Sequence, residues 1–491
     1  MSAVHSNVDL GSLPPSYTLP IAPGESTTSD DAFPSLQPSN LPAYTPPSRR
    51  TNSAPTAQGE LRQSMPKEFY YDLKRRGKVF ASLTLIAEGT YSKHMPTFLE
   101  GQPITGRVKL SFDKPDALQS VIVSIRGQVI MGANRGEQMT FIEISHTLWS
   151  PATGGEQMSI NSNHSNAPAT QEQAPAASSL NSSQPSKVKG KLQGDYMWPF
   201  SIELPNQVVW GGKTFSLPQT FYERHARASI TYEVSLQLSR GKLRADHRIP
   251  AACGYIPQSR PPPFPLMRAL AYQEGLPLFG PTIDPDGWFS CEPVVIRGKV
   301  FNIDSKSGST SSQLFLAKPL SYTRGSVIPL CLRLESMDEQ VLDLLSSPKA
   351  IVARLERRIR YFSNAENNLE SWAGKDGVDI SQPAVWWPSA EESHRSGQLR
   401  FVNGELHLRA DFKPTSAVAQ FRIQYSVVLF PFESPGVVLM ERKPLIQHPV
   451  EIVTAYALGP KPRITAPSGY LSEAPVLTPT NTISTADIGL L

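Results

Sequence analysis

The chain has 491 residues, of which 39% are hydrophobic and 18% are charged, and it contains 46 prolines and a net charge of +4. This length favours two or three domains, and the proline content indicates folded regions separated by polar segments. A charge of +4 over this length is too small to argue for a nucleic-acid partner, although it is compatible with peripheral contact with an acidic membrane surface.

The cysteines and the lengths of the apolar runs indicate which class of protein this is. Cys253, Cys291 and Cys331 are widely spaced and odd in number, which predicts reduced thiols in a cytosolic protein rather than a disulfide framework or a metal cluster. The first residues lack the basic start and apolar core of a signal peptide, and no run of about 18 apolar residues occurs. We therefore expect neither a signal peptide nor a transmembrane helix.

Residues 1–66 are rich in Pro, Ser, Thr and Asn and contain few large apolar side chains. Such a segment cannot bury enough apolar surface to offset its ordering entropy, so we predict a disordered tail. The segment 458–491 has a similar composition and leads to the same prediction.

A first β region is predicted over 67–257, because apolar and polar residues alternate there with a period of two, beginning near Lys78. The predicted inward positions are Val108, Leu110, Phe112, Val121, Val123, Ile125, Val129, Trp198, Phe200, Ile202, Leu204, Ile230, Tyr232, Val234, Leu236 and Leu238. Residues 151–190 break this pattern with low-complexity sequence and are predicted to be a disordered insert. Residues 258–284, with the stretch RPPPFP, are predicted to be a linker.

A second β region is predicted over 285–457 from the same alternation. Its predicted inward positions are Ile328, Leu330, Leu332, Leu334, Leu406, Leu408, Ala410, Phe412, Phe421, Ile423, Tyr425, Val427 and Leu429. One helix is predicted in SMDEQVLDLL, where Ser336 and Glu339 have capping-box spacing. Regular strands with short turns and no alternation with helices predict an all-β fold of two tandem antiparallel β-sandwiches.

The motifs that often carry catalysis are incomplete in this sequence. GGKTF at 211–215 ends like a phosphate-binding loop, but position 207 is Gln where the first glycine is required. His247 and His407 lie in predicted strands, with no partner at metal-binding spacing. We therefore expect no enzyme activity, no catalytic residue, no cofactor and no metal site.

Two other features have both a structural and a functional interpretation. In RLERRIR, alternation places Arg354, Glu356, Arg358 and Arg360 on one side of a strand, and we favour a solvated sheet face over contact with acidic phospholipid or phosphorylated tails. The pair Trp386-Trp387 is interpreted as a core or loop-anchoring element rather than a binding patch.

The folded regions resemble the arrestin family, and specifically fungal α-arrestins. The resemblance rests on ITGRVKLSF, SVIVSIRGQVI, WPFSIELP, LPQTF and ASITYEVSLQLSR in the first region, and on LSYTRGSVIPLCLRLES, FRIQYSVVLF and RKPLIQHPVEIVT in the second. Thr220 stands where the family commonly has serine. The resemblance implies two arrestin-type sandwiches and an adaptor without enzymatic activity. The charged partners of a phosphate-sensing polar core cannot be placed on this chain, so phosphate-triggered activation is not carried over.

Two short peptides in the N-terminal tail resemble ligands of WW domains. Pro14-Pro15-Ser16-Tyr17 has the PPxY form, in which two prolines pre-set a polyproline II shape and the tyrosine enters a second pocket. Leu41-Pro42-Ala43-Tyr44 is the LPxY variant and lacks the first proline. The predicted binding residues are Pro14, Pro15, Tyr17, Leu41, Pro42 and Tyr44.

The resemblance and the peptides together predict a cytoplasmic trafficking adaptor that is recruited to the plasma membrane or endosomes. Its expected partners are a WW-domain, HECT-type ubiquitin ligase and an integral membrane transporter or receptor, whose ubiquitination and endocytosis it would promote. The alternative is a structural arrestin-fold subunit of a vesicle or endosomal sorting complex, which would not need the WW ligands.

Overall fold

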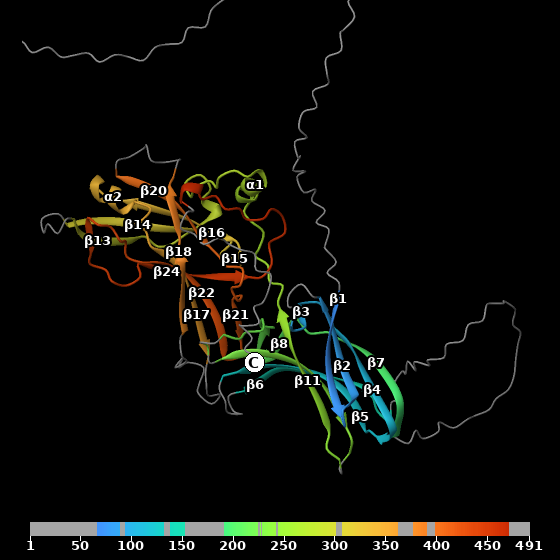
Figure 1. Ribbon diagram of the computed structural model, residues 1–491. Coiled ribbons are helices and arrows are strands. Elements are labelled where there is room, and N and C mark those ends of the chain that lie inside the picture. The colour runs from blue at the N-terminus through green and yellow to red at the C-terminus, as the bar shows by residue number, and fades with distance from the viewer. Residues whose placement is uncertain are drawn as a thin grey trace, which may run out of the picture. The chain divides into compact units, whose positions relative to one another are not determined.

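The computed structural model describes residues 66–88, 94–131, 138–152, 191–223, 226, 228–241, 244–300, 307–361, 377–389 and 398–470. These residues lie in one compact unit and form mainly antiparallel sheets (Figure 1). The prediction of an all-β fold is confirmed.

The first β region forms a sandwich of two sheets, which we call the first sandwich. One sheet has the order β1 (Pro66–Arg75), β2 (Lys78–Glu88), β4 (Ile104–Ala117) and β7 (Lys191–Ile202). The other has the order β3 (Thr97–Leu99), β11 (His247–Ile256), β10 (Ser229–Ser239), β5 (Ser120–Ile130) and β6 (Gln138–Trp149), and β8 (Gln207–Trp210) and β9 (Lys213–Ser216) form a separate hairpin. Among the described strands of this region, only β3 and β11 pair in parallel.

The second β region forms the second sandwich in the same way. Its larger sheet has the order β19 (Val385–Pro388), β20 (Leu399–His407), β16 (Val327–Glu335), β14 (Ser307–Ala317), β13 (Val294–Val300) and β23 (Val437–Leu439), with β12 (Trp288–Ser290) also paired to β14. Its other sheet has the order β15 (Ser321–Thr323), β24 (Ile446–Val453), β22 (Phe421–Leu429), β17 (Ala353–Tyr361) and β18 (Gly377–Pro383), with β21 (Ser416–Val418) paired to β22.

The period-two pattern identifies the cores of both sandwiches correctly. Every predicted inward residue is buried except Leu204 and Ala410, which are half-buried. Burying a large apolar side chain contributes about 1.5–3 kcal/mol, so the alternation accounts for most of the driving force of these sheets. Strand β1 is not predicted by the pattern, which becomes regular only at β2.

Strand β16 departs from simple alternation because both of its faces are buried. Cys331 on its outer face packs in a small cluster with Trp288 and Ala317. Helix α1 (Leu266–Glu274) buries Arg268 and Tyr272. The Nη1 of Arg268 donates to the carbonyl of Lys318, directly after β14, so the helix is anchored to the second sandwich.

Helix α1 lies inside the segment predicted to be a linker, so the prediction of a single helix was incomplete. The helix is only nine residues long and begins after Pro265, with no side-chain cap. A short helix without a polar cap has little sequence signal, which explains why the pattern misses it.

The predicted helix is present as α2 (Glu339–Leu345), but its cap differs from the prediction. The side chain of Asp338, rather than Ser336, accepts hydrogen bonds from the backbone N–H groups of Gln340 and Val341. The Oγ of Ser336 instead accepts from the backbone N–H of Asp338 at 3.2 Å and so supports the capping residue.

The last described segment, 457–470, returns along the second sandwich. The buried carboxylate of Glu405 on β20 accepts hydrogen bonds there from the backbone N–H of Thr465, at 2.6 Å, and from the hydroxyl of the same residue. The Nε2 of His407 lies 3.6 Å from the other carboxylate oxygen. The two hydrogen bonds between Thr465 and Glu405 fix the segment 457–470 to β20.

Candidate functional site: the junction of the two sandwiches

The six predicted WW-binding residues lie outside the described residues. Pro14, Pro15, Tyr17, Leu41, Pro42 and Tyr44 therefore remain a prediction from sequence. Among the described residues, polar and aromatic side chains from both sandwiches meet at their junction, which we take as the candidate functional site.

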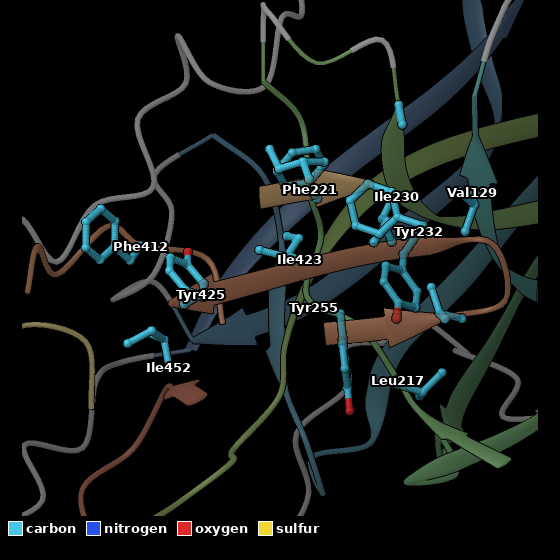
Figure 2. Packing of buried hydrophobic residues seen from close by; sticks show 14 of the residues in the cluster. Val129, Leu217, Phe221, Ile230, Tyr232, Tyr255, Phe412, Ile423, Tyr425 and Ile452 are labelled. Atoms are coloured by element: carbon cyan, nitrogen blue, oxygen red, sulfur yellow. The ribbon is translucent and has the colours of Figure 1, made fainter. Parts of the chain in front are cut away.

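An aromatic contact forms the apolar part of the junction. The rings of Phe221, after β9, and Phe421, at the start of β22, have centroids 5.2 Å apart, and both residues are buried. Figure 2 shows Phe221 with Ile423 and Tyr425 of β22 in the same buried cluster. Phe221 is held from behind by two backbone hydrogen bonds with Ile230, so the contact joins two ordered elements.

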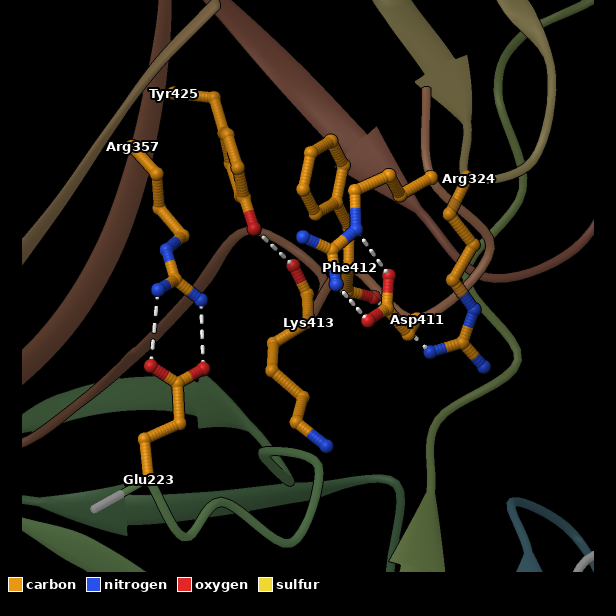
Figure 3. A network of polar contacts seen from close by, with 8 residues as sticks. Glu223, Arg324, Arg357, Asp411, Phe412, Lys413 and Tyr425 are labelled. Atoms are coloured by element: carbon orange, nitrogen blue, oxygen red, sulfur yellow. Dashed lines mark hydrogen bonds and ion pairs between the residues drawn. The ribbon is translucent and has the colours of Figure 1, made fainter. Parts of the chain in front are cut away.

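An ion pair crosses the junction beside these rings (Figure 3). The two carboxylate oxygens of Glu223 lie 2.6 and 2.9 Å from the two terminal nitrogens of Arg357 on β17. The side chains are 24% and 14% exposed, so water screens this pair less than a surface pair. A two-pronged guanidinium–carboxylate contact also fixes relative orientation, because both hydrogen bonds must be satisfied together.

Arg357 lies on the face of β17 opposite to Arg354, Glu356, Arg358 and Arg360, so the pattern of that basic side does not point to it. Arg357 shares a face of β17 with Leu355 and Ile359, both of which are buried. A charged residue at an inward position is the signal that could have indicated a buried or interdomain partner.

Arg324 makes a second polar connection across the junction. Its Nη1 donates to Oε1 of Gln219 in the first sandwich, at 3.1 Å, and to the carbonyl of Phe412 in the second, at 3.2 Å. Burial lowers the pKa of Arg324 below its usual value. The hydroxyl of Tyr425 donates to the carbonyl of Lys413 at 2.6 Å, which stabilises the loop that carries Phe412 (Figure 3).

The chain connection between the sandwiches is itself hydrogen-bonded to the end of β24. The hydroxyl of Thr454 donates to the carbonyl of Pro257 at 2.6 Å, and the backbone N–H of Ala455 donates to that of Ser259 at 2.9 Å. Arg260 donates to the carbonyl of Tyr456 at 2.9 Å. The junction thus combines an aromatic contact, an ion pair, an arginine–amide hydrogen bond and a hydrogen-bonded chain connection, an arrangement suited to setting the relative position of the two sandwiches.

The features considered for catalysis have structural roles. In GGKTF, Gly211 and Gly212 have φ of +55° and +75° and form the two-residue turn between β8 and β9, so this stretch is a hairpin rather than a phosphate-binding loop. All three cysteines are buried, and burial raises the pKa of Cys253 to about 12 and that of Cys291 to about 11.

The histidines and the tryptophan pair also pack against neighbours. His247 contacts the ring of Phe80 edge-on at 5.3 Å. Trp386 is buried against Gly404, whose missing side chain makes room for the indole. On the outer face of β17, Arg358 donates to Glu356 at 3.2 Å and Arg354 to the carbonyl of Ser381 at 3.4 Å, so these arginines have local partners.

The described part of the chain holds neither a metal-binding cluster nor a membrane-spanning helix. No group of three or more His, Cys, Asp or Glu residues is placed there to hold a metal ion. None of the helices in that part is long and apolar enough to cross a membrane.

The fold and the junction define an all-β protein of two sandwiches. Residues 88–250 match the family model of the arrestin (or S-antigen) N-terminal domain, from the end of β2 into β11. This match, over about a third of the chain, supports the arrestin family and agrees with the arrestin-type fold of the first sandwich. A search of curated proteins finds no match.

Proposed function

We propose that this protein is an arrestin-type trafficking adaptor, of the fungal α-arrestin kind, that recruits a WW-domain, HECT-type ubiquitin ligase to a membrane transporter or receptor. The observation that carries the proposal is the placement of PPSY at 14–17 and LPAY at 41–44 ahead of a matched arrestin N-terminal domain. The sandwiches would hold the cargo, and the tail peptides would hold the ligase. The adaptor itself has no enzymatic step in this proposal.

The two peptides suit a ligase with several WW domains. Tyr17 and Tyr44 are separated by a segment whose expected span as a flexible chain is on the order of 30 Å. Two weak contacts on one flexible chain raise the effective concentration of the second contact, so that the pair binds more tightly than either peptide alone. The hydroxyl-bearing rings must enter their pockets uncharged, so phosphorylation of Tyr17 should block docking.

The test is a pull-down of a WW-domain ligase by the full chain and by the Tyr17→Ala/Tyr44→Ala variant. We expect the variant to lose most of the recovered ligase, and the single Tyr17→Ala change to have the larger effect of the two singles. Phe33→Ala is the matched control, because it removes an aromatic ring from the same tail outside both motifs. Equal recovery by all variants would reject ligase recruitment and favour the structural-subunit alternative.

A further inference from the structure

One end of the first sandwich is strongly basic. This basic tip consists of residues 74–78, 113–117, 191 and the described part of 240–246, at the ends of β1, β2, β4, β7 and β10. Its basic residues are Lys74, Arg75, Arg76, Lys78, Lys114, Lys191, Arg240 and Arg244, and its acidic residues are Asp113, Asp116 and Asp246. The positive excess at this one end is at least as large as the net charge of +4 of the whole chain.

Three arginines of the basic tip meet at a single carboxylate. Oδ2 of Asp116 lies 3.1 Å from Nη2 of Arg240 and 3.6 Å from Nη1 of Arg75. Oδ1 of Asp116 accepts a hydrogen bond from Nη1 of Arg244 at 3.0 Å. One buried carboxylate can neutralise only one of three guanidinium charges, so the cluster retains two positive charges. Such an excess is relieved when an anion binds.

The three arginines differ in accessibility. The side chain of Arg240 is 6% exposed and lies over the ring of Phe80, and within the described structure its Nε makes no hydrogen bond and its Nη2 has only the ion pair with Asp116. Burial lowers the pKa of Arg240, and the charges of Arg75 and Arg244 act in the same direction, whereas Asp116 opposes them. The side chains of Arg75 and Arg244 are 61% and 60% exposed. The cluster thus has a fixed buried cation and two cations that solvent, or a ligand, can reach.

The guanidinium groups of the cluster indicate which kind of anion would bind there. Guanidinium groups bind phosphate oxygens in pairs, and basic side chains near an anionic leaflet are attracted by its surface potential. We propose that the basic tip is a docking surface for the phosphate-bearing headgroups of an anionic lipid membrane.

The placement of the charges favours a membrane over a phosphorylated peptide. The cations come from the ends of several strands rather than from positions along one groove, and Val79 is exposed among them. The adjoining cleft is lined by Lys109 and Asp195 as well as Val79, so it carries both signs of charge. The basic surface therefore does not continue along a path that an extended acidic peptide would follow.

The inference is independent of ligase recruitment, because none of the tail residues takes part in it. The Tyr17→Ala/Tyr44→Ala variant should bind membranes like the unchanged chain. A failure of one proposal is therefore distinguishable from a failure of the other.

The test is flotation of the full chain with phosphatidylcholine vesicles, with and without phosphatidylserine, at low ionic strength. The variant is Arg75→Gln/Arg244→Gln, which removes the two exposed cations and leaves the pair of Arg240 and Asp116. We expect its affinity for phosphatidylserine vesicles to fall about thirty-fold, from the loss of two basic residues near the surface. The control Arg126→Gln/Arg333→Gln removes the same charge from two arginines whose side chains are 36% and 39% exposed and that each pair with a carboxylate, and it should keep most of the affinity.

Several outcomes would overturn the proposal. Equal affinities of the tip variant and the control would show that only total charge matters. Binding of a serine-phosphorylated peptide at the tip, without vesicle binding, would make it a peptide site. Stabilisation of the unchanged chain but not the tip variant by inorganic phosphate, again without vesicle binding, would make it a site for a free anion. A melting curve for each variant verifies that it is folded.

Discussion

Glu405 and Thr465 are joined by two hydrogen bonds, since one buried carboxylate oxygen of Glu405 accepts from both the backbone N–H and the hydroxyl of Thr465. This contact connects β20 of the second sandwich to the last described segment of the chain. Segments that follow a final strand usually fray, so an anchor of this kind keeps the segment in place.

Removal of the hydroxyl tests the strength of this anchor. Thr465→Val should lower the free energy of unfolding by about 1.5–3 kcal/mol, the usual contribution of a hydrogen bond to a charged group. Chemical denaturation of the full chain provides the measurement. Thr147→Val, at an exposed position of β6, is the matched control and should change little. Similar losses in both variants would contradict the anchor.

The pH dependence of stability should report on Glu405. Burial raises the pKa of Glu405 above its usual 4.5, although hydrogen bonds from Thr465 oppose this shift. The folded state then holds a proton more tightly than the unfolded state, so this contribution to stability is complete below pH 4.5 and is lost as the pH rises through the higher folded-state pKa.

Glu405→Gln removes this titration and leaves His407, whose pKa burial lowers, in both proteins. The melting temperature of the unchanged chain should therefore fall relative to that of the variant as the pH rises above 4.5. Parallel curves between pH 4.5 and neutrality would contradict the predicted shift.

The ion pair at the junction should show energetic coupling. A double-mutant cycle of Glu223→Ala and Arg357→Ala should give an interaction energy of about 0.5–3 kcal/mol, because the two residues touch and are partly shielded from water. The same cycle on Arg126 and Glu143, which are more exposed, should give a smaller value. A junction value no larger than this control would show that the pair adds nothing beyond a surface contact.

The tryptophan packing predicts a sharp effect of one added methyl group. A side chain at Gly404 would place its first carbon 2.4 Å from the ring of Trp386, so Gly404→Ala must displace the indole or the strand. The expected loss is about 1–3 kcal/mol of unfolding free energy. Gly469→Ala, where the added carbon meets no atom within 4 Å, is the control. Trp386 fluorescence should shift only in the first variant.

The corrected helix cap can be tested directly. Asp338→Ala should destabilise α2 and cost about 1 kcal/mol, because two backbone N–H groups lose their acceptor. Ser336→Ala should have a smaller effect, since the serine contacts the capping residue rather than the helix. The reverse order in urea denaturation would restore the capping box that the spacing indicates.

The sequence predicts the cores well because burial follows a simple rule in a sandwich. A residue such as Val123 or Ile423 lies on the inner face if its neighbours two positions away do. The rule says nothing about which sheets meet, so it could not bring Glu223 and Arg357, 134 positions apart, together. The rule also assumes that one face of each strand is exposed to solvent, which fails at β16, where a small cluster of Trp288, Ala317 and Cys331 packs on the outer side.

The basic tip was missed for a similar reason. Arg75, Asp116 and Arg240 lie far apart in the sequence and come together only through strand pairing. By contrast, the proposed WW ligands are local peptides that can be identified from sequence alone, and the structure describes neither of them.

The hydrogen bond between Thr454 and Pro257 has a consequence for the motion of the two sandwiches relative to each other. The connection between the sandwiches runs beside the end of β24, where the Thr454 hydroxyl donates to the carbonyl of Pro257 and the Ala455 N–H donates to the carbonyl of Ser259. A reorientation of the sandwiches must therefore either break these hydrogen bonds or bend the chain before Pro257. The connection should behave as a short hinge at its start rather than as a freely moving linker.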